Sequence, residues 1–166
     1  AARHSLRQLT TAGLPQLKLG WIVAGGPPAL RDAALAGLEL VADSFLSVGT
    51  PVQHAAAGLL EQAGPIRAQI QERTRANLAT LRGQARAFPA CEVLRTEGGW
   101  SAVIRVPSTR SEEQLVLDLL EHEGILAHPG YFFDFPREAF VVVSLLPPPD
   151  VFRDASTRLL RCASSS

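Results

Sequence analysis

The chain has 166 residues, which is enough for one domain or for a small domain with part of another. Its 16 basic and 16 acidic residues give a formal net charge of zero, so charge gives no argument for binding nucleic acid or an anionic membrane. The longest apolar stretch, residues 140–149, is too short to span a bilayer, and no apolar signal segment opens the chain. We therefore expect a cytoplasmic protein that binds neither nucleic acid nor membrane.

Residue types that carry chemistry are sparse. Cys91 and Cys162 are too few for a disulfide framework or a zinc site, and we interpret them as ordinary thiols. The histidines lack metal-ligand spacing and are interpreted as surface or capping groups: His4, His54, His122 and His128. The sequence thus predicts no metal site. Methionine is absent even at position 1, which suggests a chain cut from a longer precursor, although a processed start would look the same.

The first half of the chain is predicted to be mainly helical. Residues 1–16 are polar and turn-rich, and residues 17–24 then predict a buried strand. A helix should follow over residues 30–45, because apolar residues recur there at the spacing of one buried face: Leu30, Ala34, Leu38, Val41 and Phe45. Thr50 and Gln53 have the spacing of a capping box for a second helix that ends near Gln62. Gly64-Pro65 should interrupt it, and a long arginine-rich helix should run over residues 66–87.

The second half predicts a sheet with helices. Residues 91–95 and 100–106 indicate two strands, the second with the alternation of a sheet that has two unlike faces. Ser111 and Gln114 form a capping box for a helix over residues 112–123 that stops at Gly124. Further strands are expected at residues 125–128 and 140–146, and a last helix at residues 150–161. This order favours an α/β class, α+β-like, with helices on one side of a mainly antiparallel sheet.

Four segments, in order along the chain, resemble motifs of class I/II aminotransferases, which are pyridoxal-phosphate (PLP) enzymes of fold type I. Residues 11–21 (TAGLPQLKLGW) resemble the stretch just after the lysine to which that family attaches PLP. Residues 47–53 (SVGTPVQ) resemble the loop and helix after the first long helix. Residues 97–100 (EGGW) resemble the entry to a small-domain strand, and residues 128–133 (HPGYFF) resemble a loop of the same domain.

The resemblance implies the C-terminal part of such an enzyme. Residues 1–26 would be a remnant of the large cofactor domain, residues 27–87 a helical connection with an interdomain helix, and residues 88–166 the C-terminal small α/β domain. The complete enzyme would use PLP to transfer an amino group between an amino acid and a 2-oxo acid, and it would be a homodimer. We expect this chain alone to bind no PLP and to be inactive.

Two departures from the family pattern bear on activity. The family lysine aligns with Thr10, and a threonine cannot attach PLP covalently. The family arginine that binds the substrate carboxylate aligns with Val142. By the resemblance, Lys18, the only lysine, occupies the place of a cation for the cofactor phosphate, and Arg137 is a candidate replacement for the missing arginine. Tyr131 is a candidate for the mouth of the substrate site.

Simpler interpretations stand beside these. Lys18 can be a solvated lysine at a strand start, Arg137 an exposed loop residue paired with Glu138, and Tyr131 a packing residue beside Phe132 and Phe133. Thr50 and Gln53 already have a sufficient role as capping residues. An alternative function is a non-enzymatic module that dimerises or binds a partner, and in that case an unpaired strand at residues 17–24 would favour edge pairing.

Overall fold

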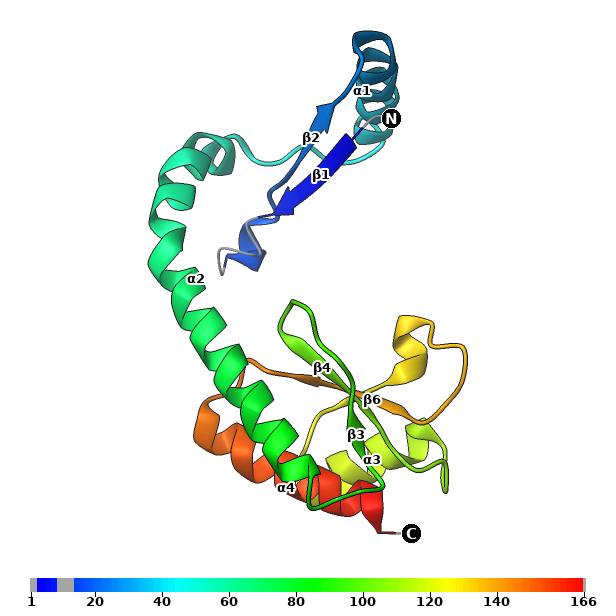
Figure 1. The fold of residues 1–166 in the computed structure, drawn as a ribbon. Coiled ribbons are helices and arrows are strands. Elements are labelled where there is room, and N and C mark those ends of the chain that lie inside the picture. Colours follow the sequence, from blue (N-terminus) through cyan, green and yellow to red (C-terminus); the bar gives the residue numbers. More distant parts are fainter. Residues whose placement is uncertain (1–2, 9–13, 166) are drawn as a thin grey trace. The chain divides into compact units, whose positions relative to one another are not determined.

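In the computed structural model, which describes residues 3–8 and 14–165, the chain divides into two compact units, Ala1–Ile70 and Gln71–Ser166 (Figure 1). The boundary lies inside one long helix, α2 (Thr50–Ala85). Each unit has a hydrophobic cluster of its own. The division predicted from the sequence, into residues 1–26, 27–87 and 88–166, stays a prediction.

The first unit contains a two-stranded antiparallel sheet of β1 (Arg3–Gln8) and β2 (Gly20–Gly25). The sequence did not predict β1, because its polar residues show no strand pattern and the strand forms by pairing with β2. The prediction that residues 17–24 form an unpaired strand is therefore wrong, because β2 is hydrogen-bonded to β1 along one edge. The expected burial is also wrong within the described residues, where Ile22 is 45% and Val23 is 57% exposed.

Two helices complete the first unit, together with the short 3-10 helix η2 (Pro15–Leu17). Helix α1 (Pro28–Ala42) has the predicted position, but its apolar stripe is not buried, and Leu30 and Val41 are more than half exposed. The small core lies instead around Ala63 of α2, against partly buried residues of α2 and of the segment 14–21, which contains η2 and the start of β2: Leu14, Leu17, Leu19, Trp21, Val52 and Leu59. The burial of this unit thus centres on the residues around β2 and not on α1.

Helix α2 corrects two predictions. It runs without a break through Gly64-Pro65, so the two predicted helices are one. A proline inside a helix removes one backbone hydrogen bond and crowds the preceding turn, but a long helix can accommodate it as a local kink and continue beyond it. The predicted capping box is not formed either, because Thr50 is already helical and the Gln53 side chain donates to the carbonyl of Val48 at 2.7 Å.

The second unit is built on a four-stranded antiparallel sheet in the order β3-β4-β6-β5. Its strands are β3 (Glu92–Val93), β4 (Ser101–Arg105), β5 (His128–Pro129) and β6 (Phe140–Ser144). Strand β6 lies between β4 and β5, with Val142 opposite Val103 on one side and opposite His128 on the other. This confirms the predicted α/β class and antiparallel sheet.

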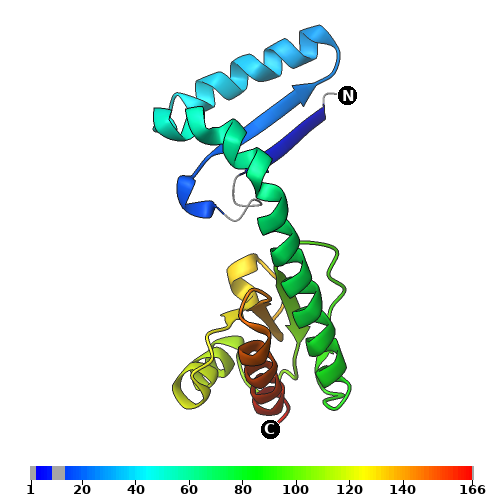
Figure 2. The same cartoon turned by 90° about the vertical axis from the view of Figure 1, so that its left-hand side faces the viewer.

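Helices cover one face of this sheet. Alternate residues of β4 and β6, such as Ile104 and Val141, join the core together with residues of α3 (Glu112–Glu123) and α4 (Pro149–Ser164) and with Leu81 of α2. The end of α2 and α4 run side by side (Figure 2), and Gln84 bonds to the carbonyl of Arg153 at 2.8 Å. Half of the predicted capping box of α3 is confirmed, because Ser111 Oγ accepts from the amide of Gln114 at 3.1 Å, whereas the Gln114 side chain donates to Asp118 Oδ1 at 3.0 Å. Among the described residues, no helix is long and apolar enough to cross a membrane.

Candidate functional site

Lys18 lies in the first unit, between η2 and β2. Its backbone is left-handed, with φ of 52°, and its amide donates to the carbonyl of Pro15 at 3.3 Å. A non-glycine residue in this region is uncommon and is held there by its surroundings. The side chain is exposed, and no carboxylate within the described ranges forms an ion pair with it. Lys18 is thus a free cation on a backbone of defined conformation. Thr10, the position of the family lysine, lies outside the described residues.

Tyr131 lies in the second unit, in a segment of residues 130–139 that joins β5 to β6 and that we call the aromatic loop. The loop begins with the 3-10 helix η3 (Gly130–Phe133). Tyr131, Phe132 and Phe133 are 48%, 62% and 53% exposed. Tyr131 packs edge-to-face on Phe132 with the ring centroids 4.9 Å apart. The loop therefore leaves these aromatic rings largely exposed and does not bury them in the core of its own unit.

Arg137 lies in the same loop. Its guanidinium carbon is 5.8 Å from the centroid of the Phe140 ring, a cation–π distance, and the Phe135 and Phe140 rings stack at 4.7 Å. Arg137 is an exposed loop residue, as the simpler interpretation expected, but no ion pair joins it to Glu138 in the part of the chain that the structure describes. Its fork of donors remains available to a carboxylate.

Val142, which aligns with the family arginine, is almost fully buried in the middle of β6. Directly opposite it in the sheet is His128, whose ring lies 6.1 Å from that of Phe132 and 6.3 Å from that of Phe133. Residues opposite each other in an antiparallel pair share a face of the sheet. His128 thus stands beside the aromatic loop, which places it closer to the candidate site than the sequence predicted.

Glu112 is the residue of this region that the sequence did not single out. It is the first residue of α3 and only 2% exposed, and its carboxylate accepts from the amides of Tyr131 at 2.9 Å and Phe140 at 2.7 Å. The only available signal was its place after the capping residue Ser111, which says nothing about burial. Both of its partners are distant in the sequence.

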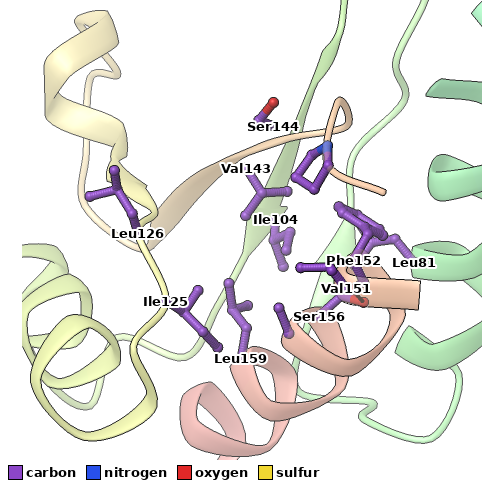
Figure 3. A pocket seen from close by; sticks show the side chains of 12 residues that line it. Leu81, Ile104, Ile125, Leu126, Val143, Ser144, Val151, Phe152, Ser156 and Leu159 are labelled. Atoms are coloured by element: carbon purple, nitrogen blue, oxygen red, sulfur yellow. Dashed lines mark hydrogen bonds between the residues drawn. The ribbon is translucent and has the colours of Figure 1, made fainter. Parts of the chain in front are cut away.

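A separate pocket with a cavity of about 100 Å³ opens at the edge of the core of the second unit (Figure 3). Its lining is apolar apart from Ser144 and Ser156, with Leu126 at one side and Val151 and Phe152 of α4 at another. Ser156 Oγ donates to Gln84 Oε1 at 2.6 Å, and Ser144 Oγ accepts from the amide of Leu146 at 3.2 Å. With both hydroxyls engaged, the cavity holds no acid, base or free nucleophile. Elsewhere in residues 3–8 and 14–165, no three His, Cys, Asp or Glu side chains could share a metal ion.

Comparison with solved structures identifies the architecture. Tyrosine aminotransferase from Leishmania infantum superposes on 98% of this chain with a TM-score of 0.82 and 16% identity. The chain has an aminotransferase fold. Alanine aminotransferase from Pyrococcus furiosus matches 97% of it with a TM-score of 0.78 and 18% identity. The α-aminoadipate aminotransferase of Thermus thermophilus, solved with N-(5'-phosphopyridoxyl)-L-leucine, matches 96% with a TM-score of 0.69 and 19% identity.

The aminotransferase fold is present only in part. The chain spans 41%, 42% and 41% of the length of these three proteins, in the order given. It therefore corresponds to a segment of such an enzyme. No family model matches the sequence, and no curated protein matches it.

Proposed function

We propose that this chain is the C-terminal part of a PLP-dependent aminotransferase, a cytoplasmic homodimer that transfers an amino group between an amino acid and a 2-oxo acid. The observation that carries the proposal is the aminotransferase fold over nearly the whole chain, at less than half the length of the similar enzymes. The four ordered motifs of the sequence, among them residues 11–21 and 128–133, support the same assignment. The chain alone is proposed to be inactive.

The described residues fit one end of the cofactor. Lys18 is exposed, unpaired within the described ranges and fixed in its backbone, so its ammonium group suits a phosphate as a point charge. PLP, when bound, supplies the electron sink that allows an amino group to leave one carbon skeleton and join another. Lys18 would hold the phosphate of PLP in the complete enzyme. The covalent attachment of PLP is not assigned to this chain, because Thr10 aligns with the family lysine.

The substrate is proposed to meet the aromatic loop. Arg137 would bind the substrate carboxylate through its planar fork, oriented by its contact with the Phe140 ring. Tyr131 would line the mouth of the site with an aromatic surface and help exclude water. Because both residues belong to one loop, a single segment would fix the carboxylate and one wall of the site.

Transamination by the natural protein that contains this chain tests the proposal. Amino donors are paired with a 2-oxo acid, and Lys18→Met, Arg137→Met and the control Arg153→Met are compared, since Arg153 is an exposed residue of α4. We expect Lys18→Met to weaken PLP binding, Arg137→Met to raise KM for the amino acid, and Arg153→Met to change neither. Absence of transamination with every donor would overturn the proposal.

A second experiment addresses the 166-residue chain itself. It is titrated with PLP, reduced with borohydride and weighed as an intact protein. We expect no stable adduct, because the lysine position of the family is Thr10. A reduced adduct on Lys18 would show that the alignment is wrong and that this chain binds the cofactor covalently.

A non-enzymatic module that dimerises or binds a partner is the second candidate. It is favoured by exposed apolar side chains near the end of α1, where Leu40, Phe45 and Leu46 are 75%, 72% and 101% exposed. Soluble domains rarely leave a contiguous apolar surface uncovered. Light scattering of the chain at rising concentration decides this point, and a strictly monomeric species would count against self-association.

A further inference from the structure

Glu112 is a buried carboxylate with two defined partners. Its Oε2 accepts from the amide of Tyr131 at 2.9 Å, and its Oε1 accepts from the amide of Phe140 at 2.7 Å. Removing a carboxylate from water is costly unless each oxygen is hydrogen-bonded, and here each oxygen has a main-chain donor. The position at the start of α3 also favours a negative charge. One amide belongs to Tyr131 near the start of the aromatic loop, and the other belongs to Phe140, the first residue of β6, directly after the loop.

Gly130 provides independent support for this arrangement. A Cβ atom built on Gly130 would lie 2.8 Å from Phe140 Cβ and 2.9 Å from Glu112 Oε1. Both distances are shorter than real Cβ contacts, so a side chain at this position would displace the carboxylate or the start of β6. Gly130, Glu112 and Phe140 therefore pack so closely that only glycine fits at position 130.

We propose that Glu112 is a positioning residue, whose two hydrogen bonds close the aromatic loop at both ends and present Tyr131 and Arg137 to the substrate in one arrangement. The loop carries left-handed backbone at Asp134 and φ of 89° at Ala139, next to the Phe140 amide that Glu112 binds. Non-glycine residues in such conformations need a surrounding structure that holds them. The role in substrate presentation rests on the proposed function, whereas the closure of the loop rests on the geometry alone.

The chemistry of the side chain explains why glutamate fits. Glutamine offers a single acceptor oxygen, so its amide nitrogen would face one of the two main-chain donors. Aspartate is shorter by one methylene group. Each oxygen of Glu112 serves one end of the loop, and the substitution Glu112→Gln therefore releases one end with almost no change in side-chain volume.

Amide hydrogen exchange of the full chain tests the closure. Exchange at Tyr131 and Phe140 is measured for the wild type, Glu112→Gln and the control Glu113→Gln, which makes the same charge change at the exposed neighbouring residue. We expect Glu112→Gln to speed exchange by about tenfold or more at one or both amides, the effect of losing one charge-assisted hydrogen bond. In Glu112→Gln, exchange at the amides of Val141 and Val143 should stay close to that of the wild type. In the control Glu113→Gln, exchange at Tyr131 and Phe140 should also stay close to that of the wild type.

Gly130→Ala provides a second variant that perturbs the same contact from the other side. We expect it also to speed exchange at Tyr131 and Phe140 while the far-ultraviolet circular dichroism of the chain is retained. Unchanged exchange at both amides in Glu112→Gln and in Gly130→Ala would overturn the closure of the loop by Glu112.

The link to substrate is tested separately, in the transaminating protein. We expect Glu112→Gln to raise KM for the amino acid by about tenfold, because the loop must be ordered before it binds, with kcat changed much less. A second outcome would be that Glu112→Gln lowers kcat without changing KM, while exchange at Tyr131 is accelerated. That result would support closure of the loop by Glu112 but would overturn its role in presenting Tyr131 and Arg137 to the substrate. Absence of any transamination would instead contradict the proposed function and leave the exchange result to decide the closure.

Discussion

Asn77 of α2 is completely buried and donates from Nδ2 to the carbonyl oxygen of Leu145 at 3.0 Å. The same nitrogen donates to the carbonyl of Pro147 at 2.9 Å. One amide group thus fastens α2 to the chain just after β6, over a sequence separation of 68 residues. The helix is thereby attached to the end of the strand that follows the aromatic loop.

The first prediction concerns this attachment. Replacing Asn77 by leucine leaves two carbonyl groups without their donor, and we expect the second unit to lose about 1–3 kcal/mol of unfolding free energy. Urea denaturation followed by fluorescence of the tryptophans measures the loss. Gln71→Leu, an equivalent change at an exposed position of α2, is the control and should stay within about 0.5 kcal/mol of the wild type. Equal stability of both variants would show that the buried amide does not fasten the helix.

The second prediction compares two arginines of the second unit. Arg110 pairs with Asp118 at 2.7 Å and also donates to the carbonyl and sulfur of Cys162, while Arg105 pairs with Glu92 on the surface. Lysine cannot reproduce a planar fork with several acceptors. We expect Arg110→Lys to lower the free energy of unfolding by about 1–2 kcal/mol and Arg105→Lys by less than about 0.5 kcal/mol. An effect of the same size at both positions would contradict this difference.

The third prediction concerns Pro65, which lies inside α2 and gives no amide to the helix. Restoring the donor with Pro65→Ala should stabilise the helix by about 1–3 kcal/mol. Pro51→Ala is the matched control, because a proline in the first turn removes no intrahelical bond, and we expect little change there. Thermal unfolding followed at the helical circular dichroism band measures both variants. A loss of stability in Pro65→Ala would mean that the proline fits a bend that the first unit requires.

The fourth prediction concerns pH. Burial raises the pKa of the Cys91 thiol, and the hydrogen bond with Ser164 opposes this rise only in part. The folded chain therefore keeps the thiol proton at pH values where the unfolded chain has lost it, so the contribution of Cys91 to stability is full below about pH 8.5 and is lost as pH rises above it.

Cys91→Ala isolates this effect. The variant should lose stability less steeply above about pH 8.5 than the wild type, by at most about 1.4 kcal/mol per pH unit. Urea denaturation at a series of pH values measures the slope, and Cys162→Ala is the control because Cys162 is only partly buried. Parallel curves for Cys91→Ala and the wild type would show that the thiol does not titrate differently in the folded chain.

The sequence predicted those elements whose signal is local. The cap formed by Ser111 and Gln114 and the stop at Gly124 involve residues close in the chain, and the structure has both. The alternation along β4 also follows from neighbouring residues, and Ala102 and Ile104 are fully buried as a two-residue period requires. In these cases the residues that determine the local structure are neighbours in the sequence, so the sequence alone predicts it.

Features made by distant residues could not be predicted in this way. The residues of β1 are polar apart from Leu6, and only pairing with β2 makes them a strand. Glu112 meets its two partners across 19 and 28 residues, so its place in the chain gives no sign that it is buried. The burial expected for β2 and α1 from their apolar pattern is not found among the described residues of this chain. Lys18, Tyr131 and Arg137 came from the resemblance, and their roles remain predictions.

The closure of the aromatic loop has a consequence for how such a protein could change. Because Glu112 holds the amides of Tyr131 and Phe140, residues 132–139 form a segment whose two ends are tied to one side chain. The register of β6 against β4 starts at Phe140, but part of the segment contacts the sheet, because Phe135 stacks on Phe140 and the carbonyl of Ala139 accepts from the amide of Val106 at 2.9 Å. We expect substitutions at the exposed positions Phe132 and Phe133 to leave the sheet intact. The exposed rings of the segment could thus change without loss of the core of the unit.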